Sequence, residues 1–392
     1  MLPKIFLGMF GPAVCVFVIV AILLGSWTWL AANLEIEDSD LLVRKNFRTM
    51  EKKTMKRFLT FLVSAFIIFF AVSASAQSKL PLRLLQTIPL PDLKAGDFDH
   101  FAVDLAGNRL FLTGEANNAV LVFDIRANKL IHTIPDVDEP HSLLYLPAAK
   151  QLWVVAGGDG TLKIFDSGTY ALIESVKVTE GADSSAYDPA KHLFYIAAGG
   201  SDAKMAFSLI NIVDTSTRKK VGDIKVDSAN IEAMAIEKNG PRIFANVRDK
   251  SLVGVIDREK RTVTSTWPLG ELHGNTPLTF DAANRRIFVV GRKPPSLVVL
   301  DSDSGKIIAT LPTAEMTDDM AFDPAGKRIY VACNDFTVVY SQKDADHYEE
   351  LGRVPTGFRA KTAILVPQLK RYYVAAPRHE KEMAGVKVYA VQ

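Results

Sequence analysis

The stretch FDPAGKRIYVAC, residues 322–333, carries the pattern that decides the fold. Apolar residues and an Asp are followed by a five-residue turn segment, then by an apolar residue and an aromatic one. Equivalents of Asp323 recur along the chain at steps of 42 to 49 residues. The seven equivalent positions are Asp104, Leu146, Asp188, Glu237, Asp281, Asp323 and Val366. A repeat of this length indicates similar supersecondary units packed side by side.

An aromatic residue stands seven positions after each of these anchors, although aromatic residues make up only 9% of the chain. These residues are Phe111, Trp153, Tyr195, Phe244, Phe288, Tyr330 and Tyr373. Each copy continues with a polar loop, a second apolar strand, a turn and, in all but the last, a further strand such as residues 307–311. Four short strands in about 43 residues are typical of one propeller blade. The sequence therefore predicts an all-β, seven-bladed β-propeller of four-stranded antiparallel blades.

The two ends of the repeat region predict how the ring closes. The seventh copy, residues 362–392, contains only three strands. An additional strand, LRLLQTIPL at residues 82–90, precedes the first copy and resembles the fourth strand KLIHTIP at residues 129–135. We expect residues 82–90 to complete the last blade, because this pairing would remove an exposed sheet edge at the seam.

Two hydrophobic segments precede the repeats. Residues 5–32 contain no charged side chain, which is long enough to cross a bilayer. Residues 58–72 form a second apolar run, which follows four basic residues and ends in Ala74-Ser75-Ala76. A basic start, an apolar run of about 15 residues and an A-x-A site are typical of a secretory signal peptide.

We therefore divide the chain into residues 1–54, a signal peptide at 55–76, and the propeller at 77–392. We expect Met55 to be the true start and the mature protein to be periplasmic or extracellular. The alternative is that residues 5–32 are a retained membrane anchor. Both interpretations send the propeller across the membrane.

Composition excludes several classes of protein. Residues 77–392 carry 38 basic and 39 acidic side chains, a net charge of −1 that argues against nucleic acid as a partner. Cys333 is the only cysteine in this region, so neither an intrachain disulfide nor a CxxCH haem attachment can form there. We expect Cys333 to be a buried small residue. There is no haem, flavin or nucleotide motif, and no HExxH or GxSxG sequence.

The strand sequences resemble one known family. Tyr330-Val331-Ala332-Cys333-Asn334-Asp335 and Tyr373-Val374-Ala375-Ala376 are similar to the signature strand of the YVTN-repeat, or YncE-like, propellers. The resemblance covers residues 82–392. It implies the propeller fold and an exported protein, but it does not select a function, because unrelated functions are built on this fold.

The candidate site comes from the starts of the first strands, which line the central channel of a propeller. The residues five positions before each anchor are all polar: Asp99, His141, Asp183, Glu232, Thr276, Asp318 and Lys361. His100 and Asp319 adjoin them, while His273 and His379 are predicted to face the same end of the channel.

We predict a ligand site on Asp99, His100, His141, Asp183, Glu232 and Asp318. These side chains suit a divalent metal, or an anionic or sugar-like ligand. The alternative is a hydrated rim that binds nothing.

The recurrent aspartates are assigned a structural role. Asp104, Asp188, Asp281 and Asp323 begin turns, and Asp124, Asp166, Asp214, Asp257 and Asp301 end strands before turns. Aspartate side chains accept hydrogen bonds from backbone N–H groups in such turns.

These observations favour an exported module that binds a small molecule or a protein, with no catalytic motif. The alternative is a metal-dependent, lactonase-like hydrolase or lyase with its site at the channel mouth. We expect a monomer that contacts a membrane only if its N-terminal segment is retained. A divalent cation is the one cofactor that the candidate residues suggest.

Overall fold

The computed structural model describes residues 80–392, which form one compact unit. The predicted N-terminal segment at 1–54 and the predicted signal peptide at 55–76 lie outside the described residues. Within residues 80–392, no helix is long and apolar enough to cross a membrane.

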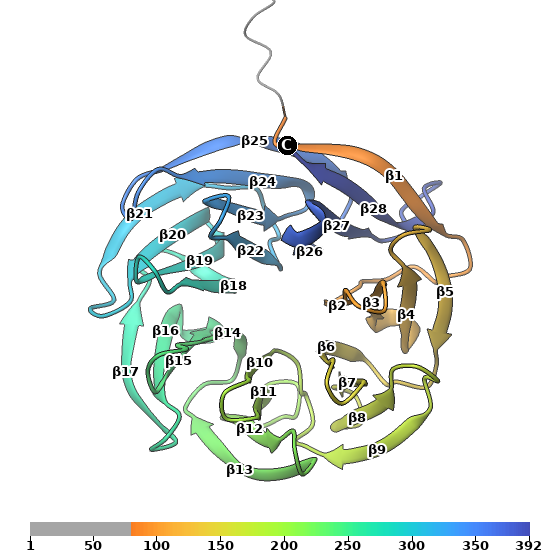
Figure 1. Ribbon diagram of the computed structural model, residues 1–392. Coiled ribbons are helices and arrows are strands. Elements are labelled where there is room, and N and C mark those ends of the chain that lie inside the picture. Colours follow the sequence, from red (N-terminus) through yellow and green to blue (C-terminus); the bar gives the residue numbers. More distant parts are fainter. Residues whose placement is uncertain (1–79) are drawn as a thin grey trace, which may run out of the picture. The chain divides into compact units, whose positions relative to one another are not determined.

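Residues 80–392 fold into seven four-stranded antiparallel sheets arranged as blades around a central axis, which confirms the predicted fold (Figure 1). Blade 1 contains β2 (Phe101–Asp104), β3 (Arg109–Gly114), β4 (Ala119–Asp124) and β5 (Lys129–Ile134). Blade 2 contains β6 (Pro140–Leu146), β7 (Gln151–Ala156), β8 (Thr161–Asp166) and β9 (Leu172–Lys177). Blade 3 contains β10 (Ser185–Asp188), β11 (Leu193–Gly199), β12 (Ser208–Asp214) and β13 (Lys219–Val226).

The next three blades repeat this order. Blade 4 contains β14 (Ile231–Ile236), β15 (Arg242–Val247), β16 (Leu252–Asp257) and β17 (Thr262–Pro268). Blade 5 contains β18 (His273–Asp281), β19 (Arg286–Lys293), β20 (Pro295–Asp301) and β21 (Ile307–Pro312). Blade 6 contains β22 (Met320–Asp323), β23 (Arg328–Ala332), β24 (Asp335–Gln342) and β25 (Tyr348–Gly357). In every blade the first strand is innermost and the fourth is outermost.

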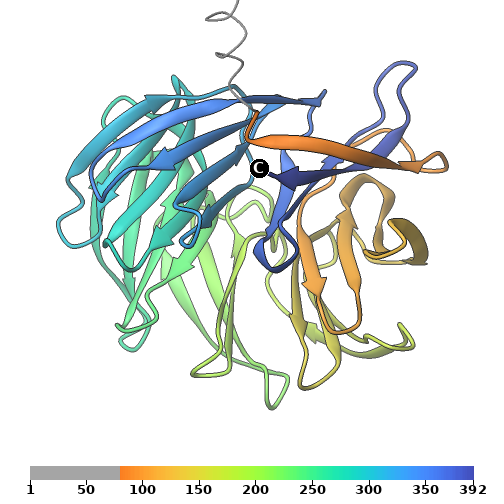
Figure 2. The same cartoon turned by 45° about the horizontal axis from the view of Figure 1, so that its top comes forward.

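Blade 7 joins the two ends of the propeller. It contains β26 (Thr362–Val366), β27 (Arg371–Ala376) and β28 (Ala384–Val391), and β1 (Leu82–Leu90) pairs antiparallel with β28 as its outer strand. The register runs from Leu82 opposite Val391 to Leu90 opposite Ala384. Figure 2 shows β1 lying along the outside of β28. The predicted closure by residues 82–90 is therefore confirmed.

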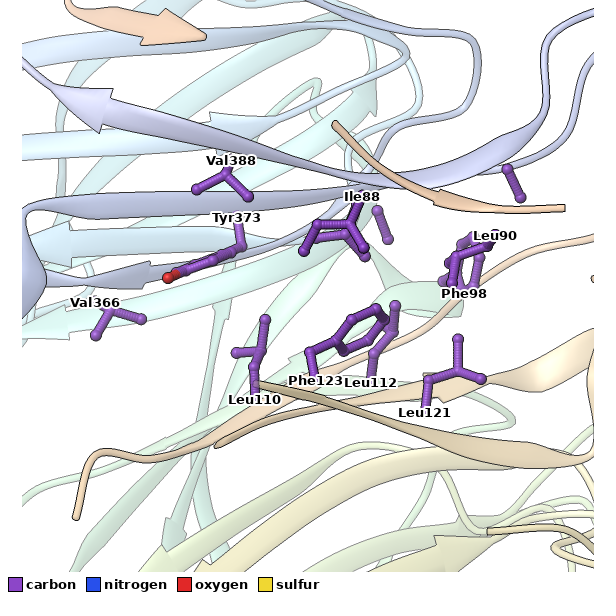
Figure 3. Close-up of a cluster of buried hydrophobic side chains, with 13 residues drawn as sticks. Ile88, Leu90, Phe98, Leu110, Leu112, Leu121, Phe123, Val366, Tyr373 and Val388 are labelled. Atoms are coloured by element: carbon purple, nitrogen blue, oxygen red, sulfur yellow. The ribbon is translucent and has the colours of Figure 1, made fainter. Parts of the chain in front are cut away.

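The repeated aromatic residues form the centre of the blade packing. All seven are buried with at most 1% of their surface exposed. The buried apolar residues of 80–392 fall into seven clusters, each built from two neighbouring blades. Figure 3 shows the cluster at the closing seam, where Ile88 of β1 and Tyr373 of β27 pack with Leu110 and Phe123 of blade 1. The ring is therefore held at the seam by the same kind of apolar packing as elsewhere.

The outer strands carry the exposed sheet edges. A β-bulge or register shift interrupts the pairing of every outer strand with its neighbour. Such irregularities increase the local twist and make an edge a poorer template for pairing with another chain.

Two short helices shape the end of the channel at which the inner strands begin. The one-turn 3₁₀ helices η1 (Glu115–Asn117) and η2 (Arg248–Lys250) connect the second and third strands of blades 1 and 4. A third, η3 (Pro367–Leu369), connects β26 to β27. The first two place Glu115 and Arg248 beside the candidate residues. Cys333 is fully buried, as predicted.

Candidate functional site

The inner strands of all seven blades begin at one end of the channel, which we call the mouth. The polar ring predicted from the repeat lies at these starts. His141, Glu232 and Thr276 lie near the first residues of β6, β14 and β18, while Asp99, Asp183, Asp318 and Lys361 directly precede β2, β10, β22 and β26. Because the inner strands surround one axis, equivalent positions in neighbouring blades can approach one another.

Asp99, His141 and Asp183 meet in this way, and we call them the histidine cluster. Nδ1 of His141 lies 2.8 Å from Oδ2 of Asp99 and 3.6 Å from Oδ1 of Asp183. One donor atom from each residue lies within 4.8 Å of the other two. The side chains of Asp99, His141 and Asp183 are 13%, 19% and 34% exposed, so the cluster is shielded but reachable from solvent.

His100 forms a second contact beside this cluster. Its Nδ1 lies 3.2 Å from Oδ1 of Asp319, and its Nε2 lies 3.9 Å from Oδ1 of Asp99. Asp319 also accepts a 2.8 Å hydrogen bond from the backbone N–H of Ala363. The hydroxyl of Thr113 accepts a 2.8 Å hydrogen bond from the backbone N–H of His100. This bond holds the backbone at His100 in place.

The remaining carboxylates of the mouth pair with basic side chains, and we call them the paired arc. Arg248 donates a 2.6 Å hydrogen bond to Glu232, and Arg292 donates a 3.0 Å hydrogen bond to Asp318. Lys361 also donates to Asp318. Asp97 completes the paired arc. It accepts hydrogen bonds from Arg359, one of them at 2.9 Å from Nε. It also lies 3.5 Å from Nζ of Lys361.

The four carboxylates of the predicted site therefore do not form one group. Glu232 and Asp318 are matched by basic side chains from their own or neighbouring blades. Asp99 and Asp183, by contrast, both contact His141. Thr276 takes no part, because its hydroxyl donates to the backbone carbonyl of Gly274 at 3.2 Å.

The electrostatics of the histidine cluster follow from burial and from these contacts. Burial and then the charge of Asp99 raise the pKa of Asp183 to about 7. Burial alone would lower the pKa of His141, but the hydrogen bond and charge of Asp99 raise it to about 9. Burial opposes ionisation of Asp99, yet His100 and His141 hold its pKa well below the usual range. The contacts therefore favour an ionised Asp99 and a protonated His141, whereas Asp183 holds its proton more tightly than an exposed aspartate does.

The pKa values of two neighbouring acids are raised, as is that of Asp183. Burial, followed by the charge of Asp99, raises the pKa of Glu115. Burial raises the pKa of Glu232 even though Arg248 opposes the shift. Perturbed acids that converge in a concave site are typical of functional centres, although structural ion-pair networks perturb pKa values too.

Sequence reasoning missed Asp97 and Arg359. Each stands two residues before a predicted ring member, Asp99 and Lys361 respectively. Side chains two apart on an extended chain point the same way, so this spacing was a usable signal. His273 and His379 lie outside the cluster. His273 contacts the hydroxyl of Ser251 at 2.7 Å, and His379 stacks on Phe358 with ring centroids 3.8 Å apart.

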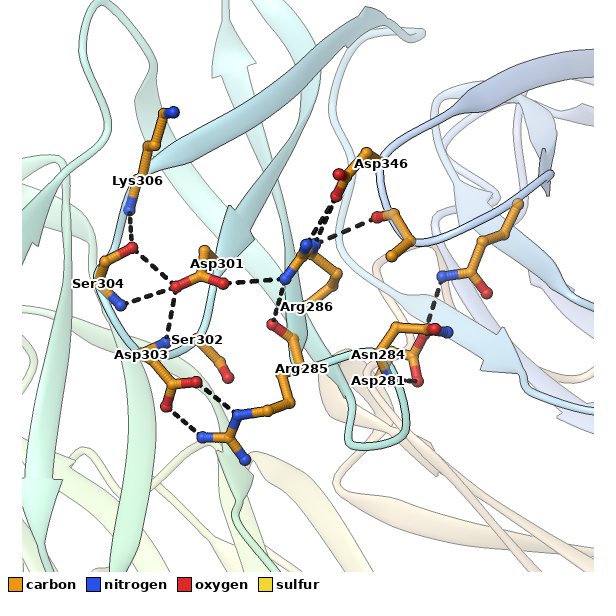
Figure 4. Close-up of polar contacts among 12 residues, drawn as sticks. Asp281, Asn284, Arg285, Arg286, Asp301, Ser302, Asp303, Ser304, Lys306 and Asp346 are labelled. Carbon is orange, nitrogen blue, oxygen red and sulfur yellow. Dashed lines mark hydrogen bonds and ion pairs between the residues drawn. The ribbon is translucent and has the colours of Figure 1, made fainter.

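The opposite end of the channel carries the recurrent aspartates. Oδ1 of Asp301 accepts hydrogen bonds from the backbone N–H groups of Asp303 and Ser304, at 3.1 and 2.9 Å (Figure 4). Asp124, Asp166, Asp214 and Asp257 accept the same pair of backbone bonds in their own turns. Their geometry agrees with the structural role assigned from the sequence.

Comparison with known proteins identifies the fold but no family. No family model matches the chain, and no curated protein matches it. Among solved structures, a chain of Kuenenia stuttgartiensis hydrazine synthase aligns with a TM-score of 0.64 at 18% identity, over 73% of this chain and 94% of that chain. A chain of a mitotic checkpoint complex aligns with a TM-score of 0.66 at 12% identity, over 81% of this chain and 94% of that one. Likeness at such low identity shows the propeller fold alone, which is consistent with a binding or scaffold module.

Proposed function

We propose that this chain is an exported ligand-binding propeller of the YVTN-repeat, YncE-like kind, and that a small hydroxy acid binds at its channel mouth. The signature strands around Tyr330 and Tyr373 support the family, and the basic-apolar-A-x-A pattern at 55–76 supports export to the periplasm or the extracellular space. The propeller acts as a monomer, and its near-neutral charge disfavours nucleic acid as the ligand.

The observation that carries the proposal is the polarity of the mouth. Blades 1 to 3 present carboxylates and histidines, whereas Arg292, Arg359 and Lys361 lie on the side of blades 5 to 7, where a ligand carboxylate would share them with Asp97 and Asp318. Hydroxyl groups donate to carboxylates, and a carboxylate accepts charge-assisted hydrogen bonds from guanidinium and ammonium groups. A molecule with hydroxyls at one end and a carboxylate at the other therefore complements both sides.

The test is a calorimetric titration with D-gluconate in the presence of EDTA, with D-glucose and acetate as matched probes. We expect saturable binding of gluconate and at least tenfold weaker binding of the other two, because each lacks one of the two groups. Lys361→Gln should weaken gluconate binding, whereas Lys191→Gln, which alters an exposed pair with Glu259, should not. Absence of gluconate binding, or equal binding by the Lys361 variant, would refute the hydroxy-acid ligand.

A second candidate is a metal-dependent, lactonase-like hydrolase or lyase. The histidine cluster favours it, because two carboxylates and an imidazole suit a catalytic divalent cation. It predicts hydrolysis of a lactone such as dihydrocoumarin by Zn²⁺-loaded protein, and loss of that activity in His141→Ala. A wild-type rate equal to that of the variant would exclude this candidate.

A further inference from the structure

The histidine cluster has the dimensions of a metal site. Its three donor atoms lie within 4.8 Å of one another, and two of the contacts measure 2.8 and 3.6 Å. Zn²⁺ binds nitrogen and oxygen donors at about 2.0–2.2 Å, so its ligand atoms are separated by roughly 3 to 3.5 Å. An ion of this size fits among the three atoms with small side-chain movements.

The backbone around the cluster holds the donors in place. The Cδ2–Nε2 edge of His141 lies against Gly157, where an added Cβ would be only 2.7 Å from Cδ2 and 2.9 Å from Nε2. The Nδ1 edge therefore faces the two carboxylates. Asp183 is anchored through its backbone, because its N–H donates to the carbonyl of Ala197 at 2.9 Å and its carbonyl accepts from Ser142 at 2.6 Å. Donors held by their surroundings bind a metal with little loss of conformational freedom.

The charge distribution around the mouth is asymmetric. Asp97, Glu232 and Asp318 each have a lysine or arginine nitrogen within 4.0 Å. Within residues 80–392, no such nitrogen lies within that distance of Asp99, Asp183 or Glu115. The carboxylates of the paired arc thus contact basic side chains, whereas Asp99 and Asp183 are contacted within 4.0 Å by histidines alone among residues 80–392. A divalent cation bound there would displace the proton of His141 and lie between two carboxylates that no lysine or arginine of residues 80–392 contacts.

We propose that Asp99, His141 and Asp183 bind a divalent transition-metal ion of the Zn²⁺ class. A nitrogen donor disfavours Mg²⁺ and Ca²⁺, which prefer all-oxygen sites, and suits Zn²⁺, Co²⁺ or Ni²⁺. Three protein ligands leave at least one coordination position for a bound molecule. This inference shares the mouth with the proposed ligand site but does not depend on the identity of that ligand.

The test is calorimetric titration of the EDTA-treated, dialysed full-length chain with ZnCl₂ and, separately, with CaCl₂. We expect about one Zn²⁺ to bind per chain with an affinity at least tenfold higher than that for Ca²⁺. His141→Ala should weaken Zn²⁺ binding at least tenfold, and Asp183→Asn should weaken it independently. Both variants should melt cooperatively in EDTA, which would show that they fold.

The matched control is His347→Ala. His347 also contacts a carboxylate at 2.9 Å, that of Asp344, but the pair is exposed and no second carboxylate of residues 80–392 lies within 4.0 Å of the ring nitrogens. Zn²⁺ affinity should be unchanged in this variant. The proposal would be overturned if wild type did not bind Zn²⁺, if folded His141→Ala and Asp183→Asn bound it as wild type does, or if Ca²⁺ bound equally well. Gluconate titration in EDTA gives a separate result, so failure of one proposal can be distinguished from failure of the other.

Discussion

The two ends of the channel both carry acidic residues at repeat-equivalent positions, yet these residues lie in opposite environments. At the turn end, Asp124 accepts hydrogen bonds from the backbone N–H groups of Arg126 and Ala127, and these bonds lower its pKa. At the mouth, the carboxyl group of Asp183 receives no hydrogen bond from residues 80–392, and burial and the charge of Asp99 raise its pKa to about 7. A recurring aspartate therefore has a structural role where its own turn supplies the donors. It is free to act on a ligand where only other side chains surround it.

The difference arises from how each residue meets its partners. A turn aspartate is satisfied within its own blade, so the contact is repeated almost unchanged in blades 1 to 5. A mouth residue meets neighbours from other blades, and these differ from blade to blade. Equivalent positions of the repeat therefore have similar contacts at the turn end and different contacts at the mouth. Binding specificity can develop at the mouth for this reason.

The largest effect on stability should come from deleting β1, because this strand closes the ring to which both ends of the channel belong. Removal of residues 82–90 leaves blade 7 with three strands and exposes the apolar cluster around Tyr373 and Val388. We expect loss of the cooperative thermal transition, measured by circular dichroism. Gln86→Ala, an exposed change within the same strand, is the control and should melt like wild type. A cooperative transition at the wild-type temperature after the deletion would show that closure is dispensable.

The next largest effect should come from Glu237→Ala at the turn end. The carboxylate of Glu237 is buried and accepts bonds of 2.8 and 2.6 Å from Arg242. Its removal leaves the guanidinium with Asp303, at 3.2 Å, and the carbonyl of Ser302 as its remaining partners, and should lower the free energy of unfolding by about 3 kcal/mol in urea. Zn²⁺ affinity should be unaffected. A change in metal binding without loss of stability would reverse the roles assigned to the two ends.

Asp301→Ala should have a smaller effect with a defined pH dependence. Ser304 donates to Asp301 through its hydroxyl and backbone N–H, and these bonds lower the pKa of Asp301 despite partial burial. We expect a loss of about 2 kcal/mol at pH 7. Because the folded-state pKa is lowered, this stabilisation is complete above the unfolded value of about 4 and disappears as the pH falls through the folded value. Urea unfolding at pH 7 and pH 3 would test this, and an equal loss at both would contradict it.

The smallest effect, and one of opposite sign, should come from Asp183→Asn at the mouth without metal. A raised folded-state pKa means that folding takes up a proton, so the contribution of Asp183 to stability falls as the pH rises from about 4 to about 7. The variant lacks this penalty. In EDTA its melting temperature should match that of wild type near pH 4 and equal or exceed it at pH 8. A lower melting temperature at pH 8 would show that Asp183 is a structural residue.

The sequence predicted the fold more completely than the candidate site. The blade count, the closing strand 82–90 and the burial of residues such as Trp153 depend on alternation and repeat length, which a single sequence displays directly. The ring positions of Asp99, His141 and Asp183 were also predictable from their equivalence. What could not be predicted was which side chains pair with one another at the mouth. Glu232 is matched by Arg248 from the short helix η2, and the direction of such a loop side chain is not encoded in the repeat.

Closure by β1 also has a consequence for the order of folding. This strand leaves the ribosome before every other part of the propeller, but its partner β28 (Ala384–Val391) is synthesised last. Six blades can form from local hairpins as they emerge, whereas the seventh needs a contact that spans almost the whole domain. Pairings of such high contact order are slow to form. We therefore expect ring completion to be the late step of folding. Once the seam is formed, the chain has no free terminal blade from which unfolding could spread, so the native state should be long-lived as well as stable.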